Sequence, residues 1–354
     1  SVPGVAVTSS ALTDLGTIGV AQGLSISGRV LAEGIPVANA TVRAGRQIFG
    51  DGTSTRAQFG GPPGANRVKE ATTDGDGAFT ISGVGNGRLY VVAEEPNLGR
   101  SASLLLPGAA ESLADLVLQL EPFGTLVGLV SVAGQPNAGT IVNVTSTTAP
   151  GVMNGVVTGE DGKFRLDRLA PDTYKVSAML GMGMMGMRLY SKVVTVAPRQ
   201  IATADLTVTE GPLELEVTPT LADGTPPGAV IVNHLVGHLD PATYPTTAPE
   251  LELLTGQLDL RSGFNISVRG SAAKIQGLAA GPTVVCATPL PREAAGMMQS
   301  MDYLEREGDR LRVFCREFVL AATPTTQAVS LPIELPVYVP PAGENPGSGS
   351  GSGS

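Results

Sequence analysis

The sequence has no tryptophan, and aromatic residues make up only 4% of its 354 residues, so a core must be built mainly from Val, Leu, Ile and Ala. Its two cysteines have no CxxC spacing and no neighbouring histidine, which disfavours a catalytic or metal role for them. No apolar run approaches the roughly 20 residues of a membrane-spanning helix. The net charge of −9 disfavours a nucleic-acid partner, because phosphate contacts need clustered Lys and Arg.

Catalytic patterns are missing as well. No Ser/His/Asp or paired-carboxylate constellation can be assembled, so we expect no catalytic residue, no cofactor and no enzymatic activity. In contrast, the chain is rich in glycine (46) and proline (27), and 42% of its residues are hydrophobic. Many turns between short apolar segments are typical of a β protein with many strands.

One pattern occurs three times along the chain, which is the mark of tandem domains. Residues 72–93 (TTDGDGAFTISGVGNGRLYVVA) and 158–178 (TGEDGKFRLDRLAPDTYKVSA) each predict an Asp-Gly turn, an alternating strand and a second strand. Residues 271–287 (SAAKIQGLAAGPTVVCA) are a degenerate copy without the Asp-Gly turn and without the aromatic residue.

The repeated unit contains the motifs G-x-V-x-x-x-G-x-P-x-x-x-A-x-V, T-D-x-D-G-x-F-x-I and L-x-x-G-x-Y-x-V-x-A. The first copy carries Gly28, Val30, Gly34, Pro36, Ala40, Val42, Thr73, Asp74, Asp76, Gly77, Phe79 and Ile81. The second carries Gly128, Val130, Gly134, Pro136, Val142, Asp161, Gly162, Phe164, Leu166, Leu169, Tyr174, Val176 and Ala178. These motifs resemble the carboxypeptidase regulatory-like domain, a transthyretin-like β-sandwich similar to the B-type repeats of collagen-binding adhesins. The resemblance implies an accessory, adhesive or spacer role outside the cytoplasm.

We predict an all-β fold of three tandem transthyretin-like or Ig-like β-sandwiches, with a short helical insertion in the third. The predicted parts are an N-terminal extra strand or linker (1–22), three sandwiches (23–122, 123–210 and 211–339) and a flexible Gly/Ser tail (340–354). The helix is expected over residues 292–307, because Met297, Met301 and Leu304 have the spacing of one helical face.

The sequence therefore predicts a non-catalytic structural or adhesive module, extracellular or at the cell surface. Its partners would be other copies of itself or other surface proteins. Residues 5–21 resemble the segments that close each repeat, so they are an edge strand or linker, or a strand that completes a neighbouring molecule. The latter alternative would make the chain a subunit of an extracellular fibre. A carbohydrate-binding accessory module, with glycans as partners, is another alternative, which the missing tryptophan disfavours.

The two cysteines fall on consecutive apolar segments of the third copy. Aligning the copies places Cys286 at the position of Ser177 and Cys315 at the position of Ser191. We expect a disulfide between Cys286 and Cys315, which would imply an oxidising compartment. Two buried free thiols are the alternative.

Eight of the nine methionines lie in two loops that follow equivalent strands, at residues 179–187 and 297–301. Three interpretations stay open: packing by an adaptable side chain, an exposed surface for a partner, and ligation of Cu(I) by thioethers. The interaction surface would comprise Met184, Met185, Met187, Met297, Met298 and Met301. The Cu(I) candidates are Met182, Met184, Met185 and Met187.

Three further motifs are weak. His234 and His238 are spaced i, i+4 in a predicted strand, which separates them by roughly 13 Å and disfavours a metal pair. The sequence Asp74-Gly-Asp76-Gly favours a turn over a calcium loop, because the later acidic ligand is missing. Asn39-Ala-Thr41, Asn143-Val-Thr145 and Asn265-Ile-Ser267 match the glycosylation sequon, but each falls in a predicted strand.

Overall fold

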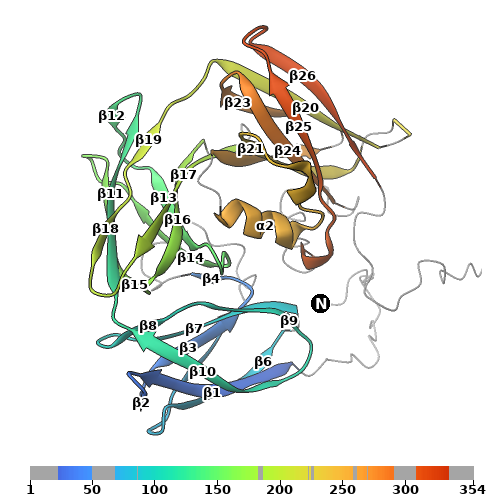
Figure 1. Ribbon diagram of the computed structural model, residues 1–354. Helices are drawn as coiled ribbons and strands as arrows, with labels where there is room; N and C mark the ends of the chain where they lie inside the picture. Colours follow the sequence, from blue (N-terminus) through green and yellow to red (C-terminus); the bar gives the residue numbers. More distant parts are fainter. Residues whose placement is uncertain are drawn as a thin grey trace, which may run out of the picture.

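The computed structural model describes residues 23–49, 68–85, 87–181, 186–221, 223–224, 227–257, 261–268, 270–290 and 308–334. The chain is mostly β, with several sheets consistent with several β-sandwich domains and with one α-helix among these residues (Figure 1). In the same ranges no helix has both the length and the apolar character needed to cross a membrane. The predicted segment 5–21, the helix over 292–307 and the tail 340–354 lie outside the described residues.

Residues 23–122, 123–210 and 211–334 each contribute one hydrophobic core and are called the first, second and third units below; that each is a separate domain stays a prediction. The first unit has an aliphatic core with Phe79 as the buried aromatic residue. Strand β1 pairs antiparallel with β6 and parallel with β10, while β3 lies between β5 and β7. Its strands are β1 (Leu24–Ala32), β2 (Ile35–Pro36), β3 (Thr41–Gly45), β4 (Ile48–Phe49), β5 (Lys69–Thr72), β6 (Ala78–Val84), β7 (Gly87–Glu95), β8 (Gly99–Ser101), β9 (Leu104–Ala109) and β10 (Leu113–Glu121).

The second unit, residues 123–210, repeats this arrangement around a separate core that contains Phe164. Strand β11 pairs antiparallel with β15 and parallel with β18 and β19, and β13 lies between β14 and β16. Its strands are β11 (Gly124–Val132), β12 (Gln135–Pro136), β13 (Ile141–Ser146), β14 (Val152–Val157), β15 (Lys163–Leu169), β16 (Asp172–Leu180), β17 (Met187–Val196), β18 (Ile201–Thr203) and β19 (Leu206–Val208).

The third unit, from residue 211 to residue 334, has a third core without an aromatic residue at its centre. Strand β20 pairs antiparallel with β23 and parallel with β26, and β24 lies between β21 and β25. Its elements are β20 (Leu213–Leu221), β21 (Ala229–Val236), η1 (Pro241–Thr243), α2 (Ala248–Gln257), β22 (Ser262–Val268), β23 (Ala273–Leu278), β24 (Gly281–Leu290), η3 (Gly308–Arg310), β25 (Phe314–Leu320) and β26 (Thr326–Ile333).

The Asp-Gly turn has the same surroundings in the first two units. Gly77 and Gly162 have φ of 70° and 73°, in the left-handed region that favours glycine. Their carbonyl oxygens accept hydrogen bonds of 2.9 Å from the N–H groups of Val30 and Val130, respectively. The carboxylate of Asp74 accepts bonds from two backbone N–H groups within the first turn, which is turn chemistry as predicted.

Backbone pairing continues across both boundaries between units. A nine-stranded sheet has the order β25-β24-β21-β22-β17-β16-β13-β14-β4 and so includes strands of all three units. Residues Met187–Leu189 of β17 pair with residues 262–264 of β22, and β14 pairs in parallel with β4. The repeat pattern predicted consecutive sandwiches with separate cores and did not predict this shared sheet, because short edge-to-edge pairings leave no periodic signal.

Helix α2 begins at a capping sequence, Thr247-Ala-Pro-Glu250, between β21 and β22. The Glu250 carboxylate accepts hydrogen bonds from the N–H groups of Thr246 and Thr247 and from the hydroxyl of Thr246. Leu251 packs with Leu235 in a small apolar cluster that is separate from the third core. Figure 1 shows α2 in the middle, facing the first and second units. A helix was predicted in the third unit, but this insertion was not the predicted place.

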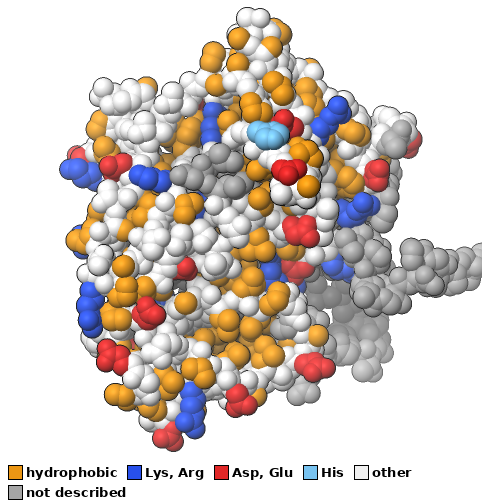
Figure 2. Space-filling model, viewed as in Figure 1, with side chains coloured by type: hydrophobic (Ala, Val, Ile, Leu, Met, Phe, Trp, Pro, Cys, Tyr) orange, Lys and Arg blue, Asp and Glu red, His pale blue; other side chains and the backbone are white. Residues whose placement is uncertain are grey.

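Charged side chains on the face shown in Figure 2 are not gathered by sign. On the face shown in Figure 2, acidic and basic side chains alternate with hydrophobic patches. Of the large hydrophobic side chains in the described ranges, those exposed are Ile35, Leu98, Val117, Ile201 and Val319.

Candidate functional site

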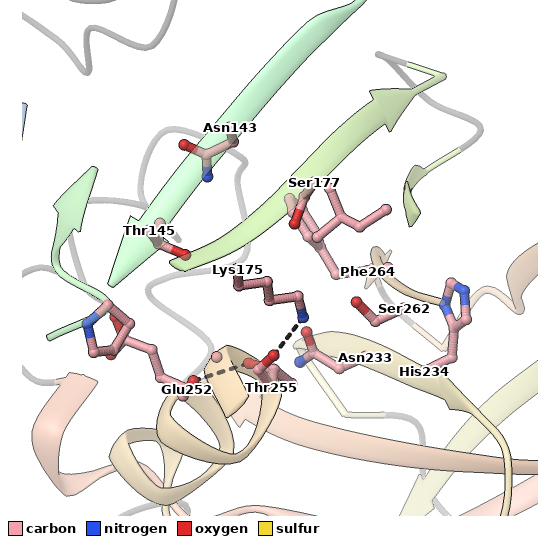
Figure 3. A pocket seen from close by; sticks show the side chains of 14 residues that line it. Asn143, Thr145, Lys175, Ser177, Asn233, His234, Glu252, Thr255, Ser262 and Phe264 are labelled. Carbon is pink, nitrogen blue, oxygen red and sulfur yellow. Dashed lines mark hydrogen bonds between the residues drawn. The ribbon is translucent and has the colours of Figure 1, made fainter. Parts of the chain in front are cut away.

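A cavity of about 170 Å³ lies where the second unit meets the third (Figure 3). Its walls come from β13, β16, β17, β21 and β22 of the shared sheet and from α2. Cross-strand pairing explains why these side chains meet. Asn143 is opposite Ser177, Leu189 is opposite Ser262, and Asn233 is opposite Phe264, so alternation places all six on one face of the sheet.

Several polar side chains of this cavity have no hydrogen-bond partner within the described residues. They are the side chains of Asn143, Thr145, Asn233 and Ser262. In Figure 3 these side chains lie around the space from which Lys175 extends towards α2. Amide and hydroxyl groups both donate and accept, so the cavity offers both functions to a polar occupant.

Charged groups at the cavity hold α2 against the other two units. The Lys175 ammonium, 5% exposed, donates to the carbonyl of Thr255 in the last turn of α2, where a cation is favourable. One turn earlier, Glu252 accepts a 2.5 Å hydrogen bond from Arg88 of the first unit. Asp309, next to the helix, also pairs with Arg88 at 3.3 Å. A helix of the third unit is therefore bound by side chains of both other units.

His234 lies one position further along β21 than Asn233 and also lines the cavity (Figure 3). The residue is 1% exposed, and neither ring nitrogen has a hydrogen-bond partner in the part of the chain that the structure describes. Burial, together with the nearby charges of Arg261 and Arg188, lowers the pKa of His234 to about 3. The ring is therefore neutral at pH 7. His238, four residues further along, is exposed, and its Nδ1 atom lies 2.6 Å from a carboxylate oxygen of Glu317.

The first and second units meet around a buried ion pair. The carboxylate of Glu94 accepts a 2.6 Å hydrogen bond from Arg100, and Arg168 of the second unit pairs with the other carboxylate oxygen at 2.5 Å. Arg100 also donates to Asn154 of the second unit at 3.3 Å. Beside this pair, Ile48 and Tyr90 pack on Val152. Breaking such a pair would leave a buried charge uncompensated.

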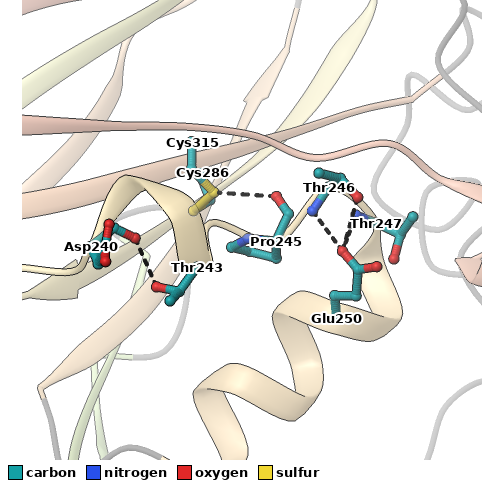
Figure 4. Close-up of a disulfide and its surroundings, with 8 residues drawn as sticks. All are labelled: Asp240, Thr243, Pro245, Thr246, Thr247, Glu250, Cys286 and Cys315. Carbon is teal, nitrogen blue, oxygen red and sulfur yellow. Dashed lines mark hydrogen bonds between the residues drawn. A yellow bond between two sulfur atoms is a disulfide. The ribbon is translucent and has the colours of Figure 1, made fainter.

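Cys286 and Cys315 form a disulfide between β24 and β25, the pairing that the sequence predicted (Figure 4). The Cys315 sulfur also contacts the carbonyl oxygen of Pro245 at 3.9 Å. In the second unit, Ser177 and Ser191 are opposite each other on β16 and β17, with their hydroxyl oxygens 2.8 Å apart. The aligned copies therefore carry a disulfide and a hydrogen-bonded serine pair at equivalent positions.

Most methionines of the predicted interaction surface lie outside the described residues, namely Met184, Met185, Met297, Met298 and Met301, and so does the Cu(I) candidate Met182. Met187 is described and is half-buried at the start of β17, opposite Phe264. The two methionine loops connect equivalent strand pairs, β16 to β17 and β24 to β25. The Cu(I) and partner-surface interpretations stay predictions. Within the described ranges, no group of three or more His, Cys, Asp or Glu side chains is placed to share a metal ion.

Sequence reasoning missed the cavity because its polar residues occupy alternate strand positions. In an isolated sandwich those positions would face water, and nothing in the repeat indicates that α2 covers them. One signal was present: Asn143 and Asn233 occupy equivalent registers, opposite Ser177 and Cys286. Asn143 belongs to one of the three sequons noted in the sequence, and here it lines a cavity.

No protein-family model matches this chain, and no curated protein matches it. Among solved structures, it is similar to the minor pilin GBS52 of Streptococcus agalactiae, with 13% identity and a TM-score of 0.26, over 53% of this chain and 98% of that one. A streptococcal ancillary pilin has 10% identity and a TM-score of 0.21 over 87% and 98% of the two chains. The shaft pilin SpaA of Lactobacillus rhamnosus GG has 10% identity and a TM-score of 0.20 over 53% and 97%. Similarities at this level carry no argument about function.

Proposed function

We propose that this chain is a non-catalytic structural or adhesive module that works outside the cytoplasm, at a cell surface. Its transthyretin-like units would act as one rigid body rather than as a flexible string. The carboxypeptidase regulatory-like resemblance of the repeated motifs and the Cys286–Cys315 disulfide support this proposal, since disulfides persist in oxidising compartments.

The observation that carries the proposal is the position of α2. The helix is bound to the first unit through Glu252 and Arg88, and to the second through Thr255 and Lys175. The shared sheet adds backbone pairing across both boundaries. A protein that resists force or presents a ligand benefits from such coupling, because a force on one unit is resisted by the others.

Location can be tested on intact cells that produce the protein. We expect brief trypsin treatment of whole cells to release peptides of this chain, while a cytosolic marker stays uncleaved. Peptides that appear only after lysis would contradict the proposal.

Rigidity can be tested by pulling single molecules from their two ends. We expect the units to unfold together in the wild type and separately in Glu252→Gln, which removes the charge that Arg88 binds. Glu160→Gln, at an exposed turn, is the matched control and should behave like the wild type. Independent unfolding of the units in the wild type would remove the argument for one rigid body.

A second candidate is a fibre subunit that assembles by strand addition through residues 5–21. It is favoured by the seven-residue strand β25, which is an edge of the shared sheet and exposes Val319 to 73%. An exposed edge can accept a strand of another chain. Electron microscopy and size-exclusion of the pure chain should then show assemblies that both Val319→Lys and deletion of residues 1–22 abolish. A strict monomer at high concentration would exclude this candidate.

A further inference from the structure

We propose that the cavity between the second and third units, lined by Asn143, Thr145, Asn233, Ser262 and Phe264, binds one neutral sugar ring. This inference goes beyond the proposed structural role and does not depend on it, because it concerns only the local chemistry of one site.

The size of the cavity suits a single ring. Its volume of about 170 Å³ holds several water-sized groups, which is enough room for one monosaccharide ring. The ring would lie between the sheet face and α2, where Gly256 has no side chain to fill the space.

The amide and hydroxyl groups of the cavity are complementary to the hydroxyl groups of a sugar. Asn143 and Asn233 occupy equivalent positions in their units and contribute one amide each from two sides of the cavity. Thr145 and Ser262 add hydroxyls, and none of the four side chains is bonded to another described residue. Each sugar hydroxyl both donates and accepts, so such a ring can satisfy amide and hydroxyl groups together.

The apolar and charged surroundings favour a neutral ligand. Phe264, Leu189 and Pro150 supply apolar surface for the C–H face of a ring. Lys175 is bound to the end of α2, and Glu252 is bound to Arg88, so both charges at the cavity have partners within the protein. The charged groups at the cavity therefore do not require an ionic ligand, which distinguishes this site from one for phosphate or a carboxylate.

Binding can be measured by saturation-transfer NMR and calorimetry on the full chain. The sugar probes are D-glucose, D-galactose, D-mannose and N-acetyl-D-glucosamine, and the anionic probes are inorganic phosphate and succinate. We expect at least one sugar to bind once per chain, and neither anion to compete with it. Binding of no sugar, or binding of an anion in preference, would overturn the inference.

Variants then locate the site. Asn233→Leu and Thr145→Val should each weaken the sugar's Kd about tenfold, the effect of one lost hydrogen bond. Thr145→Val changes little in shape, so it keeps the test valid if Asn233→Leu fails to fold. Gln200→Leu, at an exposed turn of the second unit, is the control and should bind as the wild type does. Unchanged affinity in both cavity variants would place any binding elsewhere and contradict the proposal.

Discussion

The second and third units solve the same structural problem with different chemistry. Their central hairpins have the same register, yet the second joins β16 to β17 through Ser177 and Ser191, and the third joins β24 to β25 through a disulfide. The third unit has also lost the Asp-Gly turn and carries the longest insertions. A covalent link therefore occurs in the unit whose repeated sequence pattern is weakest.

A second difference concerns one buried position. Val144 and His234 are equivalent, since they face Val176 and Val285, and both are almost fully buried. An apolar side chain suits that place, whereas neither ring nitrogen of His234 has a hydrogen-bond partner among the described residues. The second unit therefore has an apolar residue at this buried position, whereas the third unit has a polar one, next to the junction that α2 covers.

The largest effect is expected from converting the disulfide to the serine pair. Cys286→Ser with Cys315→Ser should lower the free energy of unfolding by about 3–4 kcal/mol, because the cross-link closes a loop of 29 residues. Urea unfolding followed by circular dichroism measures this, and Ser177→Ala with Ser191→Ala, costing about 1 kcal/mol, is the matched control. Equal losses in the two double variants would contradict the interpretation.

The reverse exchange should stabilise the second unit. Ser177→Cys with Ser191→Cys would close a loop of 14 residues and raise the free energy of unfolding by up to about 3 kcal/mol, less than the native disulfide contributes. Thermal melts with and without dithiothreitol separate the effect of the bond from that of the substitutions. A variant that does not oxidise would show that the two hairpins differ in geometry.

Replacing His234 by valine, the residue type at the equivalent position of the second unit, should remove a pH dependence of the stability. The pKa of His234 falls to about 3 in the folded chain and is about 6.5 when unfolded. Folding therefore opposes protonation, so stability is complete above pH 6.5 and declines as the pH falls towards 3. Between pH 6.5 and pH 5, the lost protonation of His234 lowers the free energy of unfolding by about 2 kcal/mol. Urea unfolding at both pH values should show that loss in the wild type and not in His234→Val. A similar pH slope in both proteins would refute the assignment.

The smallest effect is expected from changes in the Asp-Gly turn, which the first two units share. Gly77→Ala and Gly162→Ala should each cost about 1–2 kcal/mol, because both residues have positive φ. An added Cβ would also approach the carbonyl oxygens of Val30 and Val130 at 2.7 and 2.8 Å. Circular dichroism melts should show similar shifts for the two variants. A large difference would mean that the two turns are not equivalent.

Local patterns made much of the fold predictable. Alternating apolar residues and Asp-Gly turns located the strands, and the alignment of Cys286 with Ser177 and Cys315 with Ser191 matched their cross-strand registers. Phe79 and Phe164 are buried in their cores as expected. These features depend on residues close in sequence or on a repeated register, which a single sequence displays.

The contacts between units could not be predicted in the same way. Lys175, Glu252 and Arg88 are each ordinary charged residues in sequence, and only the folded arrangement brings them to α2. The capping sequence Thr247-Ala-Pro-Glu250 could have located this helix, which was not predicted, while the helix predicted over residues 292–307 stays a prediction. The cavity was missed as well, because α2 forms one of its walls.

The shared sheet limits how such a chain can evolve. Where units are joined only by linkers, a gene can gain, lose or reorder them with little harm. Here β22 completes an edge of β17, and β4 completes an edge of β14. Removing or exchanging one unit would leave backbone groups of its neighbour unpaired. Recombination would therefore be expected to transfer all three units together, as a single heritable block.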